Sequence, residues 1–226
     1  SIDIESKPIV GFIQTNASPG EFTNALTSYF NSYFAIKDTI ETSGDVILNM
    51  NFAIRQDPLL NEILLPGLTQ IDSASVKANF NESKQTLTAR VNFPFVNYGG
   101  AEIDSLGIQI DSDKEHLDFS LGFVELNTGP IAMDRTRIKG KLDDALLLLD
   151  FQFYQQNEIL THLSTQIELL PDSVNLKILQ DNLILDKTAW IVPATNNLTY
   201  SNQEINLNDM VFSANRQRFS LTDELD

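Results

Sequence analysis

Apolar and polar residues alternate with a period of two along most of the chain. From Val46 to Arg55 the sequence reads VILNMNFAIR, which places its apolar residues on one side of an extended strand and its asparagines on the other. The pattern returns in SVKANF, LTARVNF, LGIQI, LDFSLGF, LLLDFQF, HLSTQIEL and SVNLKI. Turn-forming clusters such as NES, YGGAE, NTGP and PDS separate these runs. The pattern therefore predicts a series of half-buried strands.

Two segments depart from this alternation. Residues 18–34 predict a helix, because Ser18 and Glu21 form a capping box around Pro19, and apolar residues follow at helical spacing. Residues 57–66 predict a second, shorter helix that begins at Asp-Pro and ends before Pro-Gly. We expect both to be inserts in a single elongated β segment that spans residues 1–226.

Strands with one apolar face form a two-sheet sandwich, a closed barrel, a propeller or a long folded sheet with a groove. The predicted strands recur about every 10 to 15 residues without long crossovers, which favours an antiparallel meander along one axis. No strict repeat period is present, which disfavours a propeller or solenoid. The favoured fold is mainly β, an elongated antiparallel sheet folded around an apolar groove, with one short amphipathic helix near the N-terminus.

The candidate groove residues are the apolar residues that share one phase of the predicted strands. They are Leu48, Met50, Phe52, Val76, Phe80, Leu87, Val91, Phe93, Leu106, Ile108, Leu117, Phe119, Leu121, Phe123, Leu147, Leu149, Phe151, Phe153, Leu163, Ile167, Leu176 and Ile178.

Composition excludes several classes of function. The chain has 226 residues, with 15 Lys and Arg against 31 Asp and Glu, which gives a formal net charge of -16. This charge repels nucleic acid and anionic bilayer surfaces. Because cysteine is absent, disulfides and thiolate chemistry are excluded. The longest apolar run, ALLLL at 145–149, is far shorter than the roughly 20 residues of a membrane helix.

The C-terminal part carries a pattern that resembles a known family. Trp190 is followed by an Asn196-Asn197 turn, then by apolar alternation through Leu198 and Tyr200. Upstream, ARVNFPFVNYGG, IDSLGIQI and LKILQDNLIL have a similar texture, so the resemblance covers roughly two-thirds of the chain. These segments resemble the strand unit of TamB-like proteins of the AsmA superfamily. The inner-membrane anchor and C-terminal module of that family are absent, so we expect an internal segment of a longer protein.

The resemblance implies a β-taco in the periplasm of a Gram-negative envelope, within a parent protein anchored in the inner membrane. It implies that the segment is part of a phospholipid-transport conduit between the two membranes and binds acyl chains in its groove. It also implies an Omp85-type outer-membrane barrel as a partner in outer-membrane protein assembly. A polar outer face would keep such a segment soluble, while each methylene buried in the groove contributes about 0.8 kcal/mol.

The stretch DRTRIKGK places Arg135, Arg137, Lys139 and Lys141 on one side of a strand. One interpretation is a solvated row of side chains paired with neighbouring carboxylates, and the other is contact with lipid headgroups or a protein partner. His116 and His162 lie on polar phases far apart in sequence, and we expect both to be exposed. No metal-ligand spacing or cofactor motif accompanies them.

No catalytic signature is present, so we predict no catalytic residue and no enzyme. A pair of glycosidase carboxylates stays an open alternative, because such pairs meet only in the folded chain. The rival function is a secreted or periplasmic β-sandwich module that binds sugar or protein. Finally, an open sheet leaves edge strands, which we expect near Ile9–Ile13 and Arg218–Leu221.

Overall fold

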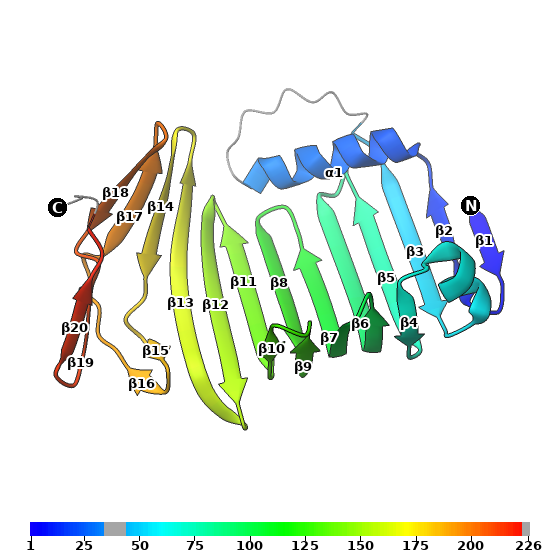
Figure 1. Cartoon of the computed structure of the whole chain (residues 1–226). Coiled ribbons are helices and arrows are strands. Elements are labelled where there is room, and N and C mark those ends of the chain that lie inside the picture. The colour runs from blue at the N-terminus through cyan, green and yellow to red at the C-terminus, as the bar shows by residue number, and fades with distance from the viewer. Residues whose placement is uncertain (34–43, 223–226) are drawn as a thin grey trace.

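A computed structural model describes residues 1–33 and 44–222 and contains one large antiparallel sheet of eighteen strands (Figure 1). Thirteen of them follow one another across its width: β1 (Ile2–Glu5), β2 (Ile9–Thr15), β3 (Ile47–Ile54), β5 (Ala74–Asn81), β6 (Thr86–Tyr98), β7 (Ala101–Ser112), β8 (His116–Phe123), β11 (Thr136–Asp143), β12 (Leu146–Gln155), β13 (Glu158–Leu170), β14 (Ser173–Ile178), β17 (Asn197–Ser201) and β18 (Glu204–Asn208). The predicted elongated antiparallel sheet is confirmed.

Five short strands extend this sheet at its margins. They are β4 (Leu68–Ile71) on the end of β6, β9 (Glu125–Asn127) on the start of β7, β10 (Ala132–Met133) on β9, β15 (Ile184–Leu185) on β13, and β16 (Thr188–Ala189) on β15. A separate hairpin, β19 (Val211–Ala214) and β20 (Gln217–Ser220), follows β18. The backbone of Ser213 in this hairpin exchanges hydrogen bonds with that of Ile191 in an isolated antiparallel β-bridge.

Tight turns give the sheet its meander order. Two-residue turns with positive φ at both positions match the right-handed twist of the strands that they join. Such turns connect neighbouring strands at Gly99–Gly100, Asp144–Ala145, Gln156–Asn157, Asp186–Lys187 and Asn202–Gln203.

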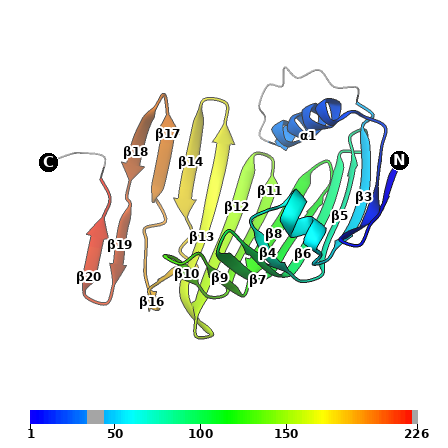
Figure 2. The ribbon, with the colours of Figure 1, turned by 45° about the vertical axis from the view of Figure 1, so that its right-hand side comes forward.

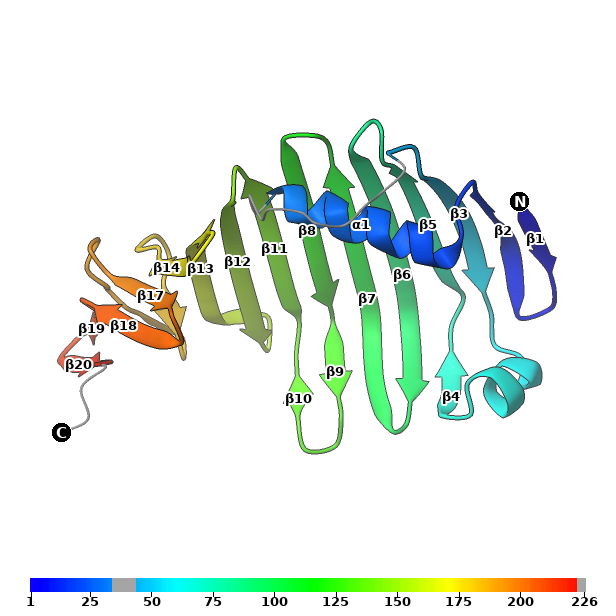
Figure 3. The ribbon, with the colours of Figure 1, turned by 90° about the horizontal axis from the view of Figure 1, so that it is seen from above.

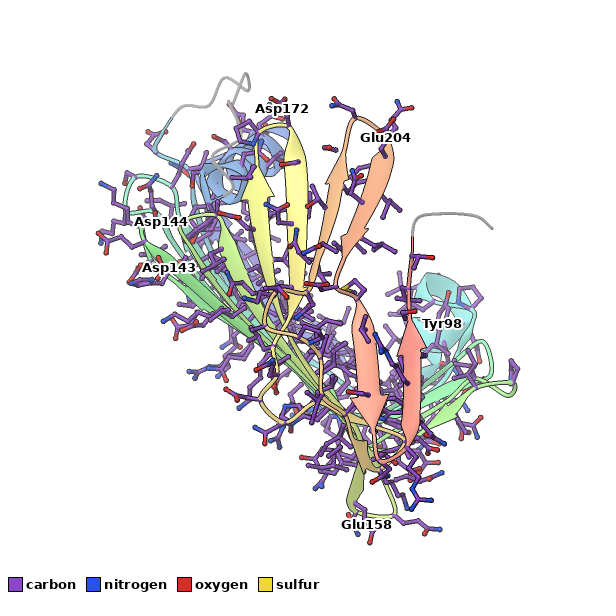
Figure 4. The ribbon with its side chains drawn as sticks, turned by 90° about the vertical axis from the view of Figure 1, so that its left-hand side faces the viewer. Tyr98, Asp143, Asp144, Glu158, Asp172 and Glu204 are labelled. Atoms are coloured by element: carbon purple, nitrogen blue, oxygen red, sulfur yellow. The ribbon has the colours of Figure 1, made fainter. Side chains whose placement is uncertain are left out.

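The sheet bends along a line that crosses β5 to β8. Along this line, Ser105 has a φ of 57° in β7, and Pro94 lies opposite it in β6. The backbone nitrogens of Asp72 and Val124 donate across the bend to Phe95 and Asp104, both at 2.9 Å. We call the part of the sheet on the side of this line that the helix α1 (Pro19–Tyr33) contacts the first arm. Beyond the line, β4, β9 and β10 form the second arm. Figure 4 shows the bend from the side, with Asp144 and Tyr98 at the outer ends of the two arms.

The helix α1 (Pro19–Tyr33) crosses the strands of the first arm (Figure 3). Its N-terminus has the predicted capping box: the Ser18 nitrogen donates to Glu21 Oε2 at 2.7 Å, and the Glu21 nitrogen donates to Ser18 Oγ at 3.4 Å. The last predicted helical residue, Phe34, lies outside the described residues. Ala25, Tyr29 and Tyr33 pack against apolar residues of the sheet, where Phe80 is only 1% exposed.

The second predicted helix is a π-helical turn, η1 (Leu60–Leu64), preceded by helical turn residues at Pro58 and Leu59. The Asp57 carboxylate accepts a hydrogen bond from the Leu59 nitrogen at 3.0 Å, which starts the turn. Only Leu60 of η1 is buried, and it packs with Leu68 and Ile71 inside the bend. Figure 2 shows η1 close to the bend, well apart from α1.

One predicted edge is wrong. Residues Ile9–Ile13 belong to β2, which pairs with β1 on one side and β3 on the other. The run Ile2–Glu5 alternates over only four residues, too few for the pattern to predict a strand, yet it pairs with β2 and forms the edge instead. At the other end, β20 pairs only with β19 within the described residues, so the segment around Arg218 does lie at an edge.

Two glycines in the centre of the sheet provide a test of side-chain packing. A Cβ added at Gly140 would lie 2.1 Å from the Phe119 ring, whereas one at Gly107 meets nothing within 4 Å. We expect Gly140→Ala to lower the free energy of unfolding by about 1–3 kcal/mol, because the ring must move. Urea denaturation should show little or no loss for Gly107→Ala. Equal stability of the two variants would contradict this packing.

Candidate functional site: an uncovered apolar sheet face

The strand register collects the apolar residues on one face of the sheet, here called the inner face, which is the face that α1 contacts. Cross-strand partners in an antiparallel sheet point to the same side. One row runs Leu48, Phe80, Leu87, Ser112, Leu117, Leu142, Leu147, Ile167, Leu176, Leu198 and Leu207. This row passes beneath α1 and is buried from Leu48 to Leu142.

A second row runs parallel to the first but lies beyond the reach of α1. It consists of eight directly paired residues, Phe52, Val76, Val91, Ile108, Leu121, Ile138, Phe151 and Leu163. Every member is only half-buried. We call this row the open stripe. At about 4.8 Å between strands, its eight strands span about 34 Å.

All candidate groove residues lie on the inner face, in these two rows or in adjacent ones. Leu48, Phe80, Leu87, Leu117 and Ile178 are buried, and the remainder are half-buried. The register therefore brings the whole candidate set onto one surface. Leu48, Phe80, Leu87 and Leu117 form a closed core with α1. Ile178 is buried in a second cluster near the C-terminus, against which Leu163 and Leu176 also pack. The other residues of the open stripe are accessible.

Several apolar residues of this face are absent from the predicted candidate set, among them Leu198 and Leu207 of the first row and two residues of β11. Ile138 completes the open stripe between Leu121 and Phe151, and Leu142 is 3% exposed beneath α1. Both alternate with the cations of β11, so the same period of two that indicated the basic row could have identified them. A further apolar row in the second arm, which only the pairing beyond the bend reveals, contains Ile71, Val96, Ile103, Leu126 and Met133.

Hydroxyl groups fix α1 to the inner face. Ser112, the polar member of the buried row, is within 2.5 Å of the Tyr29 hydroxyl and exchanges hydrogen bonds with the Leu87 backbone. Tyr29 in turn lies 2.7 Å from the Tyr33 hydroxyl, which donates to the Asp113 carbonyl. Burial, with smaller contributions from Tyr29, raises the pKa of Tyr33, so it remains a neutral donor.

The basic residues of β11 lie on the opposite, outer face. Arg137, Lys139 and Lys141 are exposed there and alternate with Ile138, Gly140 and Leu142 of the inner face. Within the described residues, no carboxylate forms an ion pair with any of them at 4.0 Å or closer. Arg135 instead stacks on the Tyr154 ring at 3.9 Å. A lipid on the inner face would be separated from these cations by the sheet.

The expectation that His162 is exposed is wrong. It is 9% exposed, and its Nε2 lies 2.6 Å from Asp150 Oδ2. Ser164 Oγ donates to the same carboxylate oxygen at 2.8 Å. The polar phase of β13 did indicate a position on the outer face, but the alternation does not predict that Asp150 on the neighbouring strand β12 would pair with His162. His116 is partly exposed and lies 3.3 Å from Asp143.

Ser164, His162 and Asp150 are the residue types of a hydrolase triad, but their geometry differs from one. In a triad, one imidazole nitrogen bonds to the carboxylate and the other to the serine hydroxyl. Here the closest approach of Ser164 Oγ to the ring is 3.5 Å, to the same Nε2 that faces Asp150. The serine donates to the carboxylate instead of to the base. The arrangement satisfies buried polar groups and does not activate a nucleophile.

Residues 1–33 and 44–222 contain no group of three or more His, Cys, Asp or Glu side chains placed to hold a metal ion. Among these residues, no helix is both long and apolar enough to cross a membrane. Comparison with family models, with curated proteins and with solved structures returned no match.

The hydroxyl network beneath α1 can be tested by removing one oxygen. We expect Tyr29→Phe to lower the free energy of unfolding by about 1 kcal/mol, because its hydrogen bonds to Ser112 and Tyr33 are lost within a buried cluster. The control is Tyr98→Phe, since Tyr98 is 52% exposed. Chemical denaturation that gives the same stability for both variants would contradict the fixing role.

The Asp150 cluster predicts a dependence of stability on pH. Burial opposes ionisation of Asp150, but hydrogen bonds from His162 and Ser164, aided by the charges of His162 and Lys139, hold the pKa of its carboxyl below the ordinary value. A pKa lowered by folding contributes stability that is present above the unfolded value, near 3.9, and is lost as pH falls through the folded value.

We therefore expect Asp150→Asn to lower the free energy of unfolding by about 1 kcal/mol at neutral pH. The difference in stability between this variant and the unsubstituted chain should shrink below about pH 4. Thermal melts across a pH series measure this difference. Asp118→Asn, at an exposed position on β8, is the control. A constant difference from pH 7 to pH 3 would argue against ionisation as its source.

Proposed function

We propose that this chain binds acyl chains on its inner face, as a segment of a phospholipid-transport conduit. The observation that carries the proposal is the open stripe. Its eight apolar side chains lie side by side across eight strands, and α1 covers none of them, although Leu163 at one end packs against the C-terminal cluster of Ile178 and Leu183. An exposed apolar surface this extended is uncommon on a soluble domain and marks an interaction site.

The chemistry of the stripe favours a flexible aliphatic ligand. Its members are aliphatic or phenylalanine, so they offer dispersion contacts and no directional polar groups. Each methylene laid against such a surface contributes up to about 0.8 kcal/mol when it is fully buried. The buried row under α1 forms one margin, and the bend towards β4 and β9 forms the other.

The finer assignment rests on the resemblance to TamB-like proteins of the AsmA superfamily. The elongated folded sheet and the single apolar face agree with that interpretation. Under it, the segment works in the periplasm as part of an inner-membrane-anchored parent protein. Further segments would extend the apolar surface across the envelope, and an Omp85-type barrel would be the outer-membrane partner.

The rival interpretation, a β-sandwich module that binds sugar or protein, finds less support. Such a module buries its apolar residues between two facing sheets. Here the long strands belong to one sheet. Rings that would form a sugar-binding platform, such as Phe93, Phe119 and Phe151, lie on the inner face and not among the polar residues of the outer face.

Two arginine substitutions on neighbouring positions of β12 test the proposal. Phe151 belongs to the open stripe, whereas Leu148 is 41% exposed on the outer face. Native mass spectrometry after incubation with phosphatidylethanolamine should detect bound lipid on the unsubstituted chain and on Leu148→Arg. We expect Phe151→Arg to lose most of it, because a guanidinium in the stripe must be desolvated beneath an acyl chain.

Thermal melts of the same variants keep the test interpretable. Because Phe151 is half-buried and faces uncovered surface, Phe151→Arg should remain folded. Unfolding of this variant, absence of lipid on the unsubstituted chain, or equal lipid retention by both variants would each count against the proposal.

A further inference from the structure

The outer face contains a shallow hollow on the opposite side of the sheet from the open stripe, although Val91, Ile108 and Leu121 of that stripe contribute to its lining. It has a volume of about 390 Å³ and lies over β6, β7, β8 and β11. Its floor is bare because Gly107 and Gly122 are direct cross-strand partners without side chains. In the same cross-strand row, Asn92 precedes Gly107 and Arg137 follows Gly122. In the next row, Arg90, Gln109, Ser120 and Lys139 are paired in sequence across the strands.

The polar lining of this hollow is rich in hydrogen-bond donors. Three of its corners are the cations Arg90, Arg137 and Lys139, and the fourth is Asn92. Gln109 and Ser120 lie between them. None of the described residues that line the hollow is acidic. In a chain with twice as many acids as bases, this local reversal of charge is a specific feature.

The cations differ in how far neighbouring carboxylates compensate them. Lys139 has Asp150 directly opposite on β12, and its charge contributes to the lowered pKa of that carboxyl. The two arginines have no such partner. Arg137 has Gly122 on one side and Gln152 on the other.

Arg90 lies between Lys77 and Gln109, so its nearest cross-strand charge is of the same sign. Like charges placed directly opposite one another on a sheet are destabilising, and an anion bound between the strands would relieve this. The uncompensated arginines thus lie at diagonal corners of the hollow, three strand spacings and one cross-strand row apart, or about 16 Å at the backbone.

The net charge of -16 opposes any anion at long range. At about 0.1 M salt, however, charges more than about 10 Å away are largely screened, while groups in direct contact are not. The local charges therefore decide the outcome within the hollow. Four nearby carboxylates compete with an anion. Asp111 and Asp118 form the next cross-strand pair beside Gln109 and Ser120, and Asp150 lies opposite Lys139. Asp104 lies next to Ser105 at the margin and accepts a hydrogen bond from its Oγ at 2.6 Å.

We propose that this hollow binds a small ligand with two phosphate groups. The guanidinium fork matches phosphate oxygens in a bidentate manner, and the long arginine side chains can each reach inward from opposite sides. Asn92, Gln109 and Ser120 would donate to the oxygens between them. Because the site is on the outer face, it does not depend on acyl-chain binding.

Isothermal titration with sodium pyrophosphate at about 0.1 M NaCl tests the proposal. We expect saturable binding to the unsubstituted chain and at least tenfold weaker binding, measured as a higher Kd, in Arg137→Gln and in Arg90→Gln. Lys114→Gln changes the net charge equally at an exposed turn between β7 and β8, and it should bind like the unsubstituted chain. Asp104→Asn should bind more tightly.

Gly107→Asp supplies an independent variant, because it leaves both arginines in place. Its Cβ meets nothing within 4 Å, so the variant should fold, but its carboxylate would occupy the floor and abolish binding. Circular dichroism melts check that each variant is folded.

A second arm uses vesicles containing phosphatidylglycerol to distinguish free phosphate ligands from lipid headgroups. Binding of pyrophosphate alone, with the variant pattern above, supports a soluble ligand. Vesicle binding with the same variant pattern would identify headgroup phosphates as the source. The proposal is overturned if the unsubstituted chain binds neither probe, or if Lys114→Gln weakens binding as much as Arg137→Gln does.

Discussion

The structure depends on the contact between α1 and the first arm of the sheet. Phe80 lies at its centre, with the Tyr29 ring 5.5 Å and the Phe22 ring 5.8 Å away in edge-to-face geometry. A sheet with one apolar face must cover that face to be stable. Here a fifteen-residue helix is the cover, and it is too narrow for the whole surface. The uncovered remainder becomes the open stripe, so the same contact that stabilises the fold also defines the limits of the candidate site.

The period of two in each strand links the two faces. A residue that enters the inner row forces its neighbours onto the outer face, so the stripe and the polar hollow are built by the same strands. Ile138 and Leu121 lie in the stripe while Arg137, Lys139 and Ser120 lie across the sheet from them. A change of register by one residue would exchange the two surfaces, which explains why tight two-residue turns matter here. They prevent slippage where the hydrophobic pattern alone leaves some freedom.

Most of the strands and the helix could be predicted because their signals are local. Alternation such as VILNMNFAIR and the Ser18–Glu21 capping box need no knowledge of distant residues. Three features could not be predicted for the opposite reason. The bend depends on Pro94 and Ser105 meeting across two strands, and the burial of His162 depends on Asp150 from the preceding strand. The third, the glycine floor, requires the register that pairs Gly107 with Gly122. In each case the decisive partner is set by pairing that composition and spacing do not encode.

The placement of α1 in the chain has a consequence for the order of assembly. The helix precedes all the buried strand residues of its core, which extend from Leu48 in β3 to Leu142 in β11. During synthesis, α1 leaves the ribosome before any of these partners exists, and isolated helices of this length are marginal in water. Neighbouring strands pair through short loops and so form early, whereas docking of α1 must wait until β11 has joined β8. The helix that covers the sheet is thus synthesised before the sheet but docks on it late.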